Sequence, residues 1–191
     1  LRDVMVDQFL QSFDEAPARI TLDVDAFDDP CHGQQQLVLF HGFYDQHQYL
    51  PIAFTCAEND LVVFIALRFG SCASFLGADD DLRYLARRLR AVWPDVEIVL
   101  RGASGFGNPT MYNVCEELRI TYTFGIGMNS VLKKMSDELL ETAVAQFEAT
   151  QQPQRLFQSQ MYRAGSWPAA RRTIIKCEAN SLGTNRRAVV T

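Results

Sequence analysis

Two carboxylates lie at the end of a strongly alternating segment, and their type and spacing could support chemistry. Residues 19–25 alternate between apolar and polar side chains, and the run ends with Asp23 and Asp25. The alternation predicts a strand with one buried face. An acid at the end of a strand either forms a turn or caps a helix, or it holds a cation through its carboxylate oxygens. The residues alone favour the structural role.

A glycine-rich turn follows a second short strand and could lie beside the first one. Residues 96–101 predict a strand, and residues 102–107 read Gly-Ala-Ser-Gly-Phe-Gly. The turn lacks the lysine and the glycine spacing of a phosphate-binding loop, so nucleotide binding is not expected. If the two strands are adjacent and parallel, their carboxyl ends share one edge of the sheet. Asp25 and the turn at residues 102–104 would then meet there.

The histidines and cysteines do not show the spacing of a metal site. His32, His41 and His47 have no i, i+4 relationship, and packing or turn formation accounts for them. The five cysteines are scattered and never form a CxxC pair, which argues against both a disulfide framework and a zinc site.

The elements that must position these residues are an initial group of strands followed by alternating strands and helices. Apolar periodicity predicts helices at residues 80–93, 109–118 and 130–147. Strands are expected at residues 19–25, 37–43, 51–56, 61–67, 96–101, 120–124, 155–163, 173–177 and from 187 onward, the early ones as an antiparallel meander. This order predicts a mixed α/β fold with helices packed on a sheet.

Composition narrows the class of protein. The chain has 18 basic and 23 acidic residues, a formal net charge of −5, which argues against a stand-alone DNA-binding module. No apolar run approaches the roughly 18 residues of a membrane helix, and no basic-then-apolar leader opens the chain. We therefore expect a cytoplasmic protein with no membrane partner and no small-molecule cofactor.

Several strings resemble motifs of bacterial insertion-sequence transposases of the DDE type. Residues 22–35 resemble the first catalytic motif, in which an acid ends a strand and His-Gly-Gln follows. Residues 101–106, Arg-Gly-Ala-Ser-Gly-Phe, resemble a second motif that normally reads Arg-Gly-Asp-Ser-Gly-Phe. Shorter strings at residues 122–126, 164–168 and 187–191 fit the later pattern. The likeness spans nearly the whole chain in the right order.

The resemblance implies a ribonuclease-H-like fold and metal-dependent cleavage and transfer of DNA strands. Residues about 20–126 would form the core, and residues about 127–191 a helix and a β-rich insertion within a single partial catalytic domain, residues 1–191. Two Mg²⁺ or Mn²⁺ ions held by three acids would activate the attacking oxygen and stabilise the leaving one. Asp25 corresponds to the first acid, with Asp23 as the other candidate. The implied partners are transposon-end DNA and further copies of the chain.

Two departures from the family pattern predict that this chain is inactive. Ala103 stands where the second Asp is expected, and a methyl group cannot bind a cation. The third acid, a Glu in a Tyr-Arg-Glu-Lys motif, is expected after the strand at which the chain stops; Glu178 is the late acid that could replace it. The chain begins at Leu1 without Met and stops within a strand-like run, so we expect a fragment truncated at both ends. The alternative is a non-enzymatic remnant that binds DNA or full-length transposase subunits.

The resemblance also suggests where DNA would be contacted, because the tail strands of the family approach the transposon end. The candidates are His32, which could equally stabilise its turn, and the four arginines Arg171, Arg172, Arg186 and Arg187.

Overall fold

The computed structural model describes residues 1–191, which divide into two compact units, Leu1–Tyr122 and Thr123–Thr191. The mixed α/β class expected from the order of elements is confirmed. No helix is both long enough and apolar enough to span a membrane.

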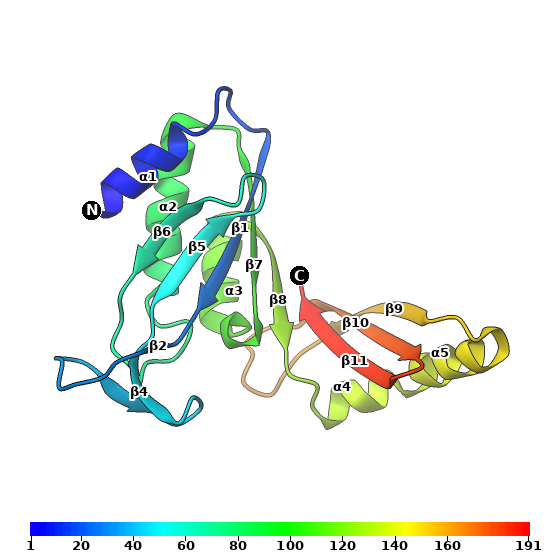
Figure 1. Ribbon diagram of the computed structural model, residues 1–191. Helices are drawn as coiled ribbons and strands as arrows, with labels where there is room; N and C mark the ends of the chain where they lie inside the picture. The colour runs from blue at the N-terminus through cyan, green and yellow to red at the C-terminus, as the bar shows by residue number, and fades with distance from the viewer. The chain divides into compact units, whose positions relative to one another are not determined.

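The first unit is built on a mixed sheet in which β6, β5, β1 and β7 are neighbours in that order (Figure 1). The strands of the first unit are β1 (Arg19–Ala26), β2 (Asp29–Pro30), β3 (Leu39–His41), β4 (Gln46–Tyr49), β5 (Ile52–Cys56), β6 (Val62–Ala66) and β7 (Glu97–Gly102). Its helices are α1 (Arg2–Leu10), α2 (Ala78–Val92), α3 (Pro109–Glu117) and the 3₁₀ turn η1 (Ser104–Phe106). β1 pairs with β5 antiparallel and with β7 parallel.

The alternation in β1 buries one face of the sheet, as predicted. Ile20, Leu22 and Val24 are almost completely buried, whereas the residues between them are half-buried or exposed. Helices α2 and α3 lie on one side of this sheet in Figure 1. The apolar stripe of α2 is buried, with Leu82 and Leu89 both 0% exposed. The predicted helices at residues 80–93 and 109–118 are therefore present, with small shifts at their ends.

The early meander was predicted only in part. β5 and β6 form the expected hairpin, and β5 pairs with β1, but residues 39–41 belong to a separate small sheet of order β2-β4-β3. β4 was missed because Gln46, His47 and Gln48 give no apolar alternation. Its pairing depends instead on the turn that connects it to β3, where Asp45 has a φ of 54°.

The second unit is a sheet in the order β8-β11-β10-β9 with two helices (Figure 1). Its elements are α4 (Ser130–Met135), α5 (Asp137–Thr150), β9 (Gln154–Tyr162), β10 (Arg171–Asn180) and β11 (Gly183–Val190); β8 (Thr121–Ile126) begins in the first unit and continues into the second. α5 packs against β9, β10 and β11. β9 has the expected length, shifted by one residue. β10 and β11 are longer than expected, because their polar residues take part in regular antiparallel pairing.

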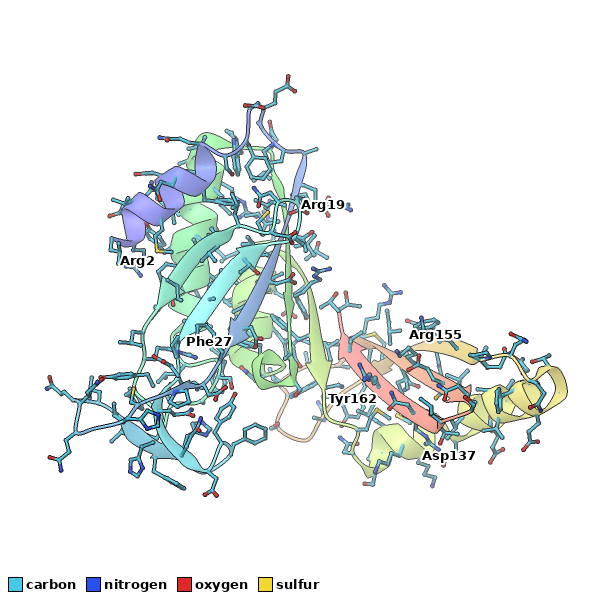
Figure 2. All side chains as sticks on the ribbon, in the orientation of Figure 1. Arg2, Arg19, Phe27, Asp137, Arg155 and Tyr162 are labelled. Atoms are coloured by element: carbon cyan, nitrogen blue, oxygen red, sulfur yellow. The ribbon has the colours of Figure 1, made fainter.

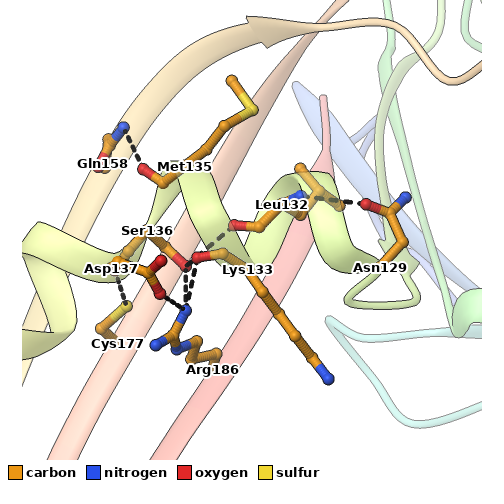
Figure 3. A network of polar contacts seen from close by, with 9 residues as sticks. All are labelled: Asn129, Leu132, Lys133, Met135, Ser136, Asp137, Gln158, Cys177 and Arg186. Atoms are coloured by element: carbon orange, nitrogen blue, oxygen red, sulfur yellow. Dashed lines mark hydrogen bonds and ion pairs between the residues drawn. The ribbon is translucent and has the colours of Figure 1, made fainter.

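The single long helix predicted for residues 130–147 is wrong, since two helices meet at Ser136. The Ser136 hydroxyl lies 3.0 Å from the carbonyl oxygen of Leu132 and 2.9 Å from that of Lys133. Arg186 donates to the same Lys133 carbonyl, to Ser136 Oγ at 3.2 Å and to Asp137 Oδ1 at 2.7 Å (Figure 3). The apolar periodicity of residues 130–147 continues through Ser136 without interruption. It therefore could not predict a break at which a distant strand makes polar contacts.

Candidate functional site

The carboxyl ends of β1 and β7 meet at one edge, as the parallel arrangement predicted. The register pairs Asp23 with Arg101 and Val24 with Gly102. Continued by one residue, it pairs Asp25 with Ala103, on strands that lie about 4.8 Å apart. Side chains of one row of a sheet point to the same side, here the side opposite the buried core residues of β1.

Asp25 is exposed at the end of β1, and its Oδ1 accepts a hydrogen bond of 2.8 Å from the backbone amide of Ala26. Figure 2 shows Phe27 just beyond the strand end. Burial, and after it the negative charges of Asp28 and Asp25, raise the pKa of Tyr44, so its hydroxyl stays protonated near these carboxylates. Asp25 is thus reachable from solvent, whichever role it has.

Asp23 forms an ion pair with Arg101. Both carboxylate oxygens of Asp23 accept hydrogen bonds of 2.6 Å from the guanidinium, one from Nε and one from Nη2. The hydrogen bond to Asp23 also raises the pKa of Arg101. A carboxylate held in this two-point arrangement has little capacity left for a metal ion. The sequence could not reveal the pairing, because it depends on the register of strands 78 positions apart in the chain.

The turn that carries Ala103 is held by packing against the segment that contains Ser74. Phe106 in η1 is 1% exposed, and a Cβ atom placed on Gly105 would lie only 2.9 Å from the Cβ of Ser74. The segment that contains Ser74 is itself held by Arg68, whose Nη1 donates to the carbonyls of Ser74 at 2.8 Å and of Leu76 at 2.9 Å. The backbone at Ala103 is therefore positioned firmly at the strand end.

These residues do not fit a two-metal centre. Among the residues at the ends of β1 and β7, Asp25 is the carboxylate without a cationic partner, and the Ala103 side chain offers no ligand atom. Asp28 follows β1, and its carboxylate accepts a hydrogen bond of 2.9 Å from Gln46 Nε2. No group of three or more His, Cys, Asp or Glu side chains anywhere in the chain is arranged to hold a metal ion.

Glu178 lies in the second unit, on β10, and is held by two cations. Its Oε1 is 2.8 Å from Arg155 Nε, and its Oε2 is 2.8 Å from Lys176 Nζ. The hydrogen bond from Lys176, and then that from Arg155, lower the pKa of Glu178. The ion pairs give it a structural role within the sheet.

The four arginines of β10 and β11, Arg171, Arg172, Arg186 and Arg187, point to two opposite faces of the sheet, because side chains alternate along a strand. Arg171 is 6% exposed, and Arg186 donates to the α4–α5 junction (Figure 3), so both face α5. Arg172 and Arg187, one residue further on, point to the opposite, exposed face. His32 is exposed in the loop between β2 and β3. Of the predicted DNA-contacting residues, Arg172, Arg187 and His32 are the exposed ones, and Arg172 Nε donates to Ser159 Oγ at 3.0 Å.

The comparison with known families covers the entire chain. Residues 1–191 match the family described as transposase DDE domain group 1. No curated protein matches the chain. The match confirms the resemblance seen in the motifs, and the mixed α/β architecture is that of a ribonuclease-H-like DDE transposase domain. It also supports a role connected with DNA transposition, in a family that generally uses divalent metal ions. The chain belongs to the transposase DDE domain group 1 family.

Proposed function

We propose that this chain is a transposase DDE domain that binds DNA but does not itself cleave it. The observation that carries the proposal is the register of β1 and β7, whose last pair is Val24 with Gly102 and which, continued by one residue, would set Ala103 beside Asp25. The family chemistry needs carboxylates from neighbouring strand ends to hold two metal ions on the reacting phosphodiester. With a methyl group at one of these positions, a single open carboxylate remains.

The other candidate acids are already committed to ion pairs and do not compensate for Ala103. Asp23 is bound by Arg101, and Glu178 is bound by Arg155 and Lys176. Releasing either carboxylate would leave a guanidinium or ammonium group without its partner.

Binding to DNA would use cations that are exposed and not committed to internal contacts. Arg187 meets this condition, and Arg172 is exposed and uses only its Nε, which donates to Ser159 Oγ at 3.0 Å. The two arginines lie on neighbouring strands of one face. Contacts of this kind neutralise backbone phosphates and give affinity that falls with salt.

The proposal is tested with a mixed-sequence 30-base-pair duplex for binding and a supercoiled plasmid for cleavage. We expect salt-sensitive binding that is reduced in Arg172→Ala/Arg187→Ala but not in Lys134→Ala, which removes an exposed charge on α4. We expect no nicking with Mg²⁺ or Mn²⁺. Metal-dependent nicking that disappears in Asp25→Ala would overturn the proposal. Failure to bind duplex, together with association with an active full-length transposase, would instead support the remnant that acts on subunits.

A further inference from the structure

One face of the second unit's sheet is left uncovered by helices. α5 packs against the side that carries Ile175 and Cys177, both 0% exposed. The alternate residues of the three strands form the other side, which we call the open face. It comprises Arg155, Phe157, Ser159 and Met161 of β9, Arg172, Ile174, Lys176 and Glu178 of β10, and Asn185, Arg187 and Val189 of β11.

The open face is positively charged within an acidic chain. It carries four basic side chains, Arg155, Arg172, Lys176 and Arg187, against the single acid Glu178, a formal net charge of +3. The chain as a whole has a formal net charge of −5. Glu178 is paired with Arg155 and Lys176, so no acid of this face neutralises Arg172 or Arg187. Arg172 Nε donates to the neutral Ser159 hydroxyl at 3.0 Å, which leaves its charge in place for an external partner.

Large apolar side chains stand among these cations. Phe157 is 61% exposed and Met161 is 62% exposed. The register sets Phe157, Lys176 and Arg187 side by side across three strands, and Met161 beside Arg172 in a second row. An exposed aromatic ring flanked by cations on a flat sheet suits a ligand that has both negative charges and flat apolar faces.

We propose that the open face binds single-stranded nucleic acid, with an unpaired base on the ring of Phe157 and backbone phosphates at Arg172 and Arg187. This deepens the proposed DNA binding by naming an unpaired strand as the ligand. In a duplex the bases are stacked on one another and present only their edges in the grooves, so the Phe157 ring could not stack on them. Bases of an unpaired strand stack on aromatic side chains while cations follow its backbone. A second copy of this face is a poorer occupant, because in a two-fold dimer like patches meet and the cations would repel.

The test uses the full chain and a fluorescein-labelled 12-nucleotide oligothymidylate in anisotropy titrations at low salt. We expect the oligonucleotide to bind more tightly than a duplex of the same length. Phe157→Ala should weaken binding about tenfold or more, the effect of losing one base–aromatic stack. Phe157→Tyr, which keeps the ring, should bind like the parent. Leu182→Ala, in the exposed β10–β11 turn, is the matched control and should change nothing.

Salt dependence checks the charged part of the face. Arg187→Ala should reduce the slope of log affinity against log salt by about 0.7, the value for one phosphate contact with a single strand. Lys134→Ala, on α4, should leave the slope unchanged. Circular dichroism of each variant confirms that the fold is retained.

Three results would overturn the inference: equal binding by Phe157→Ala and Leu182→Ala, no preference for the single strand over the duplex, or a concentration-dependent dimer that Phe157→Ala dissolves. Loss of duplex binding with retained single-strand binding would contradict only the proposed function. Plasmid nicking would do the same, since the inference makes no claim about catalysis.

Discussion

Arg101 and Asp23 form a two-point ion pair across β1 and β7, with Nε–Oδ1 and Nη2–Oδ2 distances of 2.6 Å. The register of the two strands ends at Val24 with Gly102, and continued by one residue it would set Asp25 beside Ala103. The edge at the ends of β1 and β7 therefore has one carboxylate bound to a guanidinium, the exposed carboxylate of Asp25 and the methyl group of Ala103. This arrangement explains why we propose DNA binding without cleavage, and it can be changed one residue at a time.

Replacing Ala103 with Asp should create a metal site. The new carboxylate would stand beside Asp25 on the neighbouring strand, and Mg²⁺ or Mn²⁺ is bound well by two such groups together with water. Isothermal titration calorimetry should show tighter Mn²⁺ binding by Ala103→Asp than by the parent, and the gain should vanish in Ala103→Asp/Asp25→Ala. Ala103→Asn has a similar shape without the charge and should bind weakly; equal affinity of the Asp and Asn variants would contradict the proposed site.

Gly105→Ala should destabilise the turn that carries Ala103. Its Cβ would lie 2.9 Å from Ser74 Cβ and 3.1 Å from Ser74 Oγ, closer than unstrained contacts allow. We expect a loss of about 1–3 kcal/mol in the free energy of unfolding, the usual cost of overpacking. Adding Ser74→Gly removes the clashing atoms, so a double-mutant cycle by urea denaturation should show strong coupling. Additive losses would mean that the two residues are not in contact.

Gly70, which lies against the backbone of the small sheet, should be hard to replace. A Cβ there would lie 1.8 Å from the carbonyl oxygen of Gln48 and 2.5 Å from that of Leu39, and backbone atoms cannot move aside as a flexible side chain can. Gly70→Ala should cost about 3 kcal/mol or more, at the upper end of single substitutions. Gly42→Ala is the matched control, because no atom lies within 4 Å of its added Cβ. Similar melting temperatures for the two variants would be inconsistent with this packing.

Glu58 should contribute pH-dependent stability. Burial acts to raise its pKa, but hydrogen bonds from the Thr21 amide, at 2.9 Å to each oxygen, and from Cys56 outweigh it, so the pKa of Glu58 is lowered. A lowered folded-state pKa means that this stabilisation is present above the unfolded-state value of about 4.3. It is lost as the pH falls through the folded-state value.

Thermal melts over a pH series test this contribution. Glu58→Gln should be less stable than the parent at neutral pH and should approach it in acid. Glu15→Gln, which changes an exposed acid, should follow the parent throughout. A constant difference between Glu58→Gln and the parent at all pH values would show that the carboxylate charge does not matter.

The sequence predicted the elements whose cause is local. The spacing of the buried leucines predicted α2 at Leu82, Leu85 and Leu89. The alternation of apolar residues predicted β1 at Ile20, Leu22 and Val24. Both patterns follow directly from the burial of one side of the element. Motif strings identified the family, which the match over residues 1–191 confirmed.

Features that depend on partners distant in the chain were not predictable. The Arg101–Asp23 pair needs the register of β1 and β7, and the break at Ser136 needs Arg186 from a strand about 50 residues later. The tail arginines were predicted as one DNA-binding group. Neighbouring residues of a strand face opposite sides, and only the pairing with β9 and the packing of α5 show which side is open.

The central claim is that the parent chain lacks a catalytic metal site at the ends of β1 and β7. Calorimetric titration of Mn²⁺ into the parent protein and into Asp25→Ala tests it most directly. We predict weak, non-stoichiometric heats that are the same for both proteins, as expected from scattered surface carboxylates. A one-to-one site of micromolar affinity in the parent protein that is abolished in Asp25→Ala would contradict the claim.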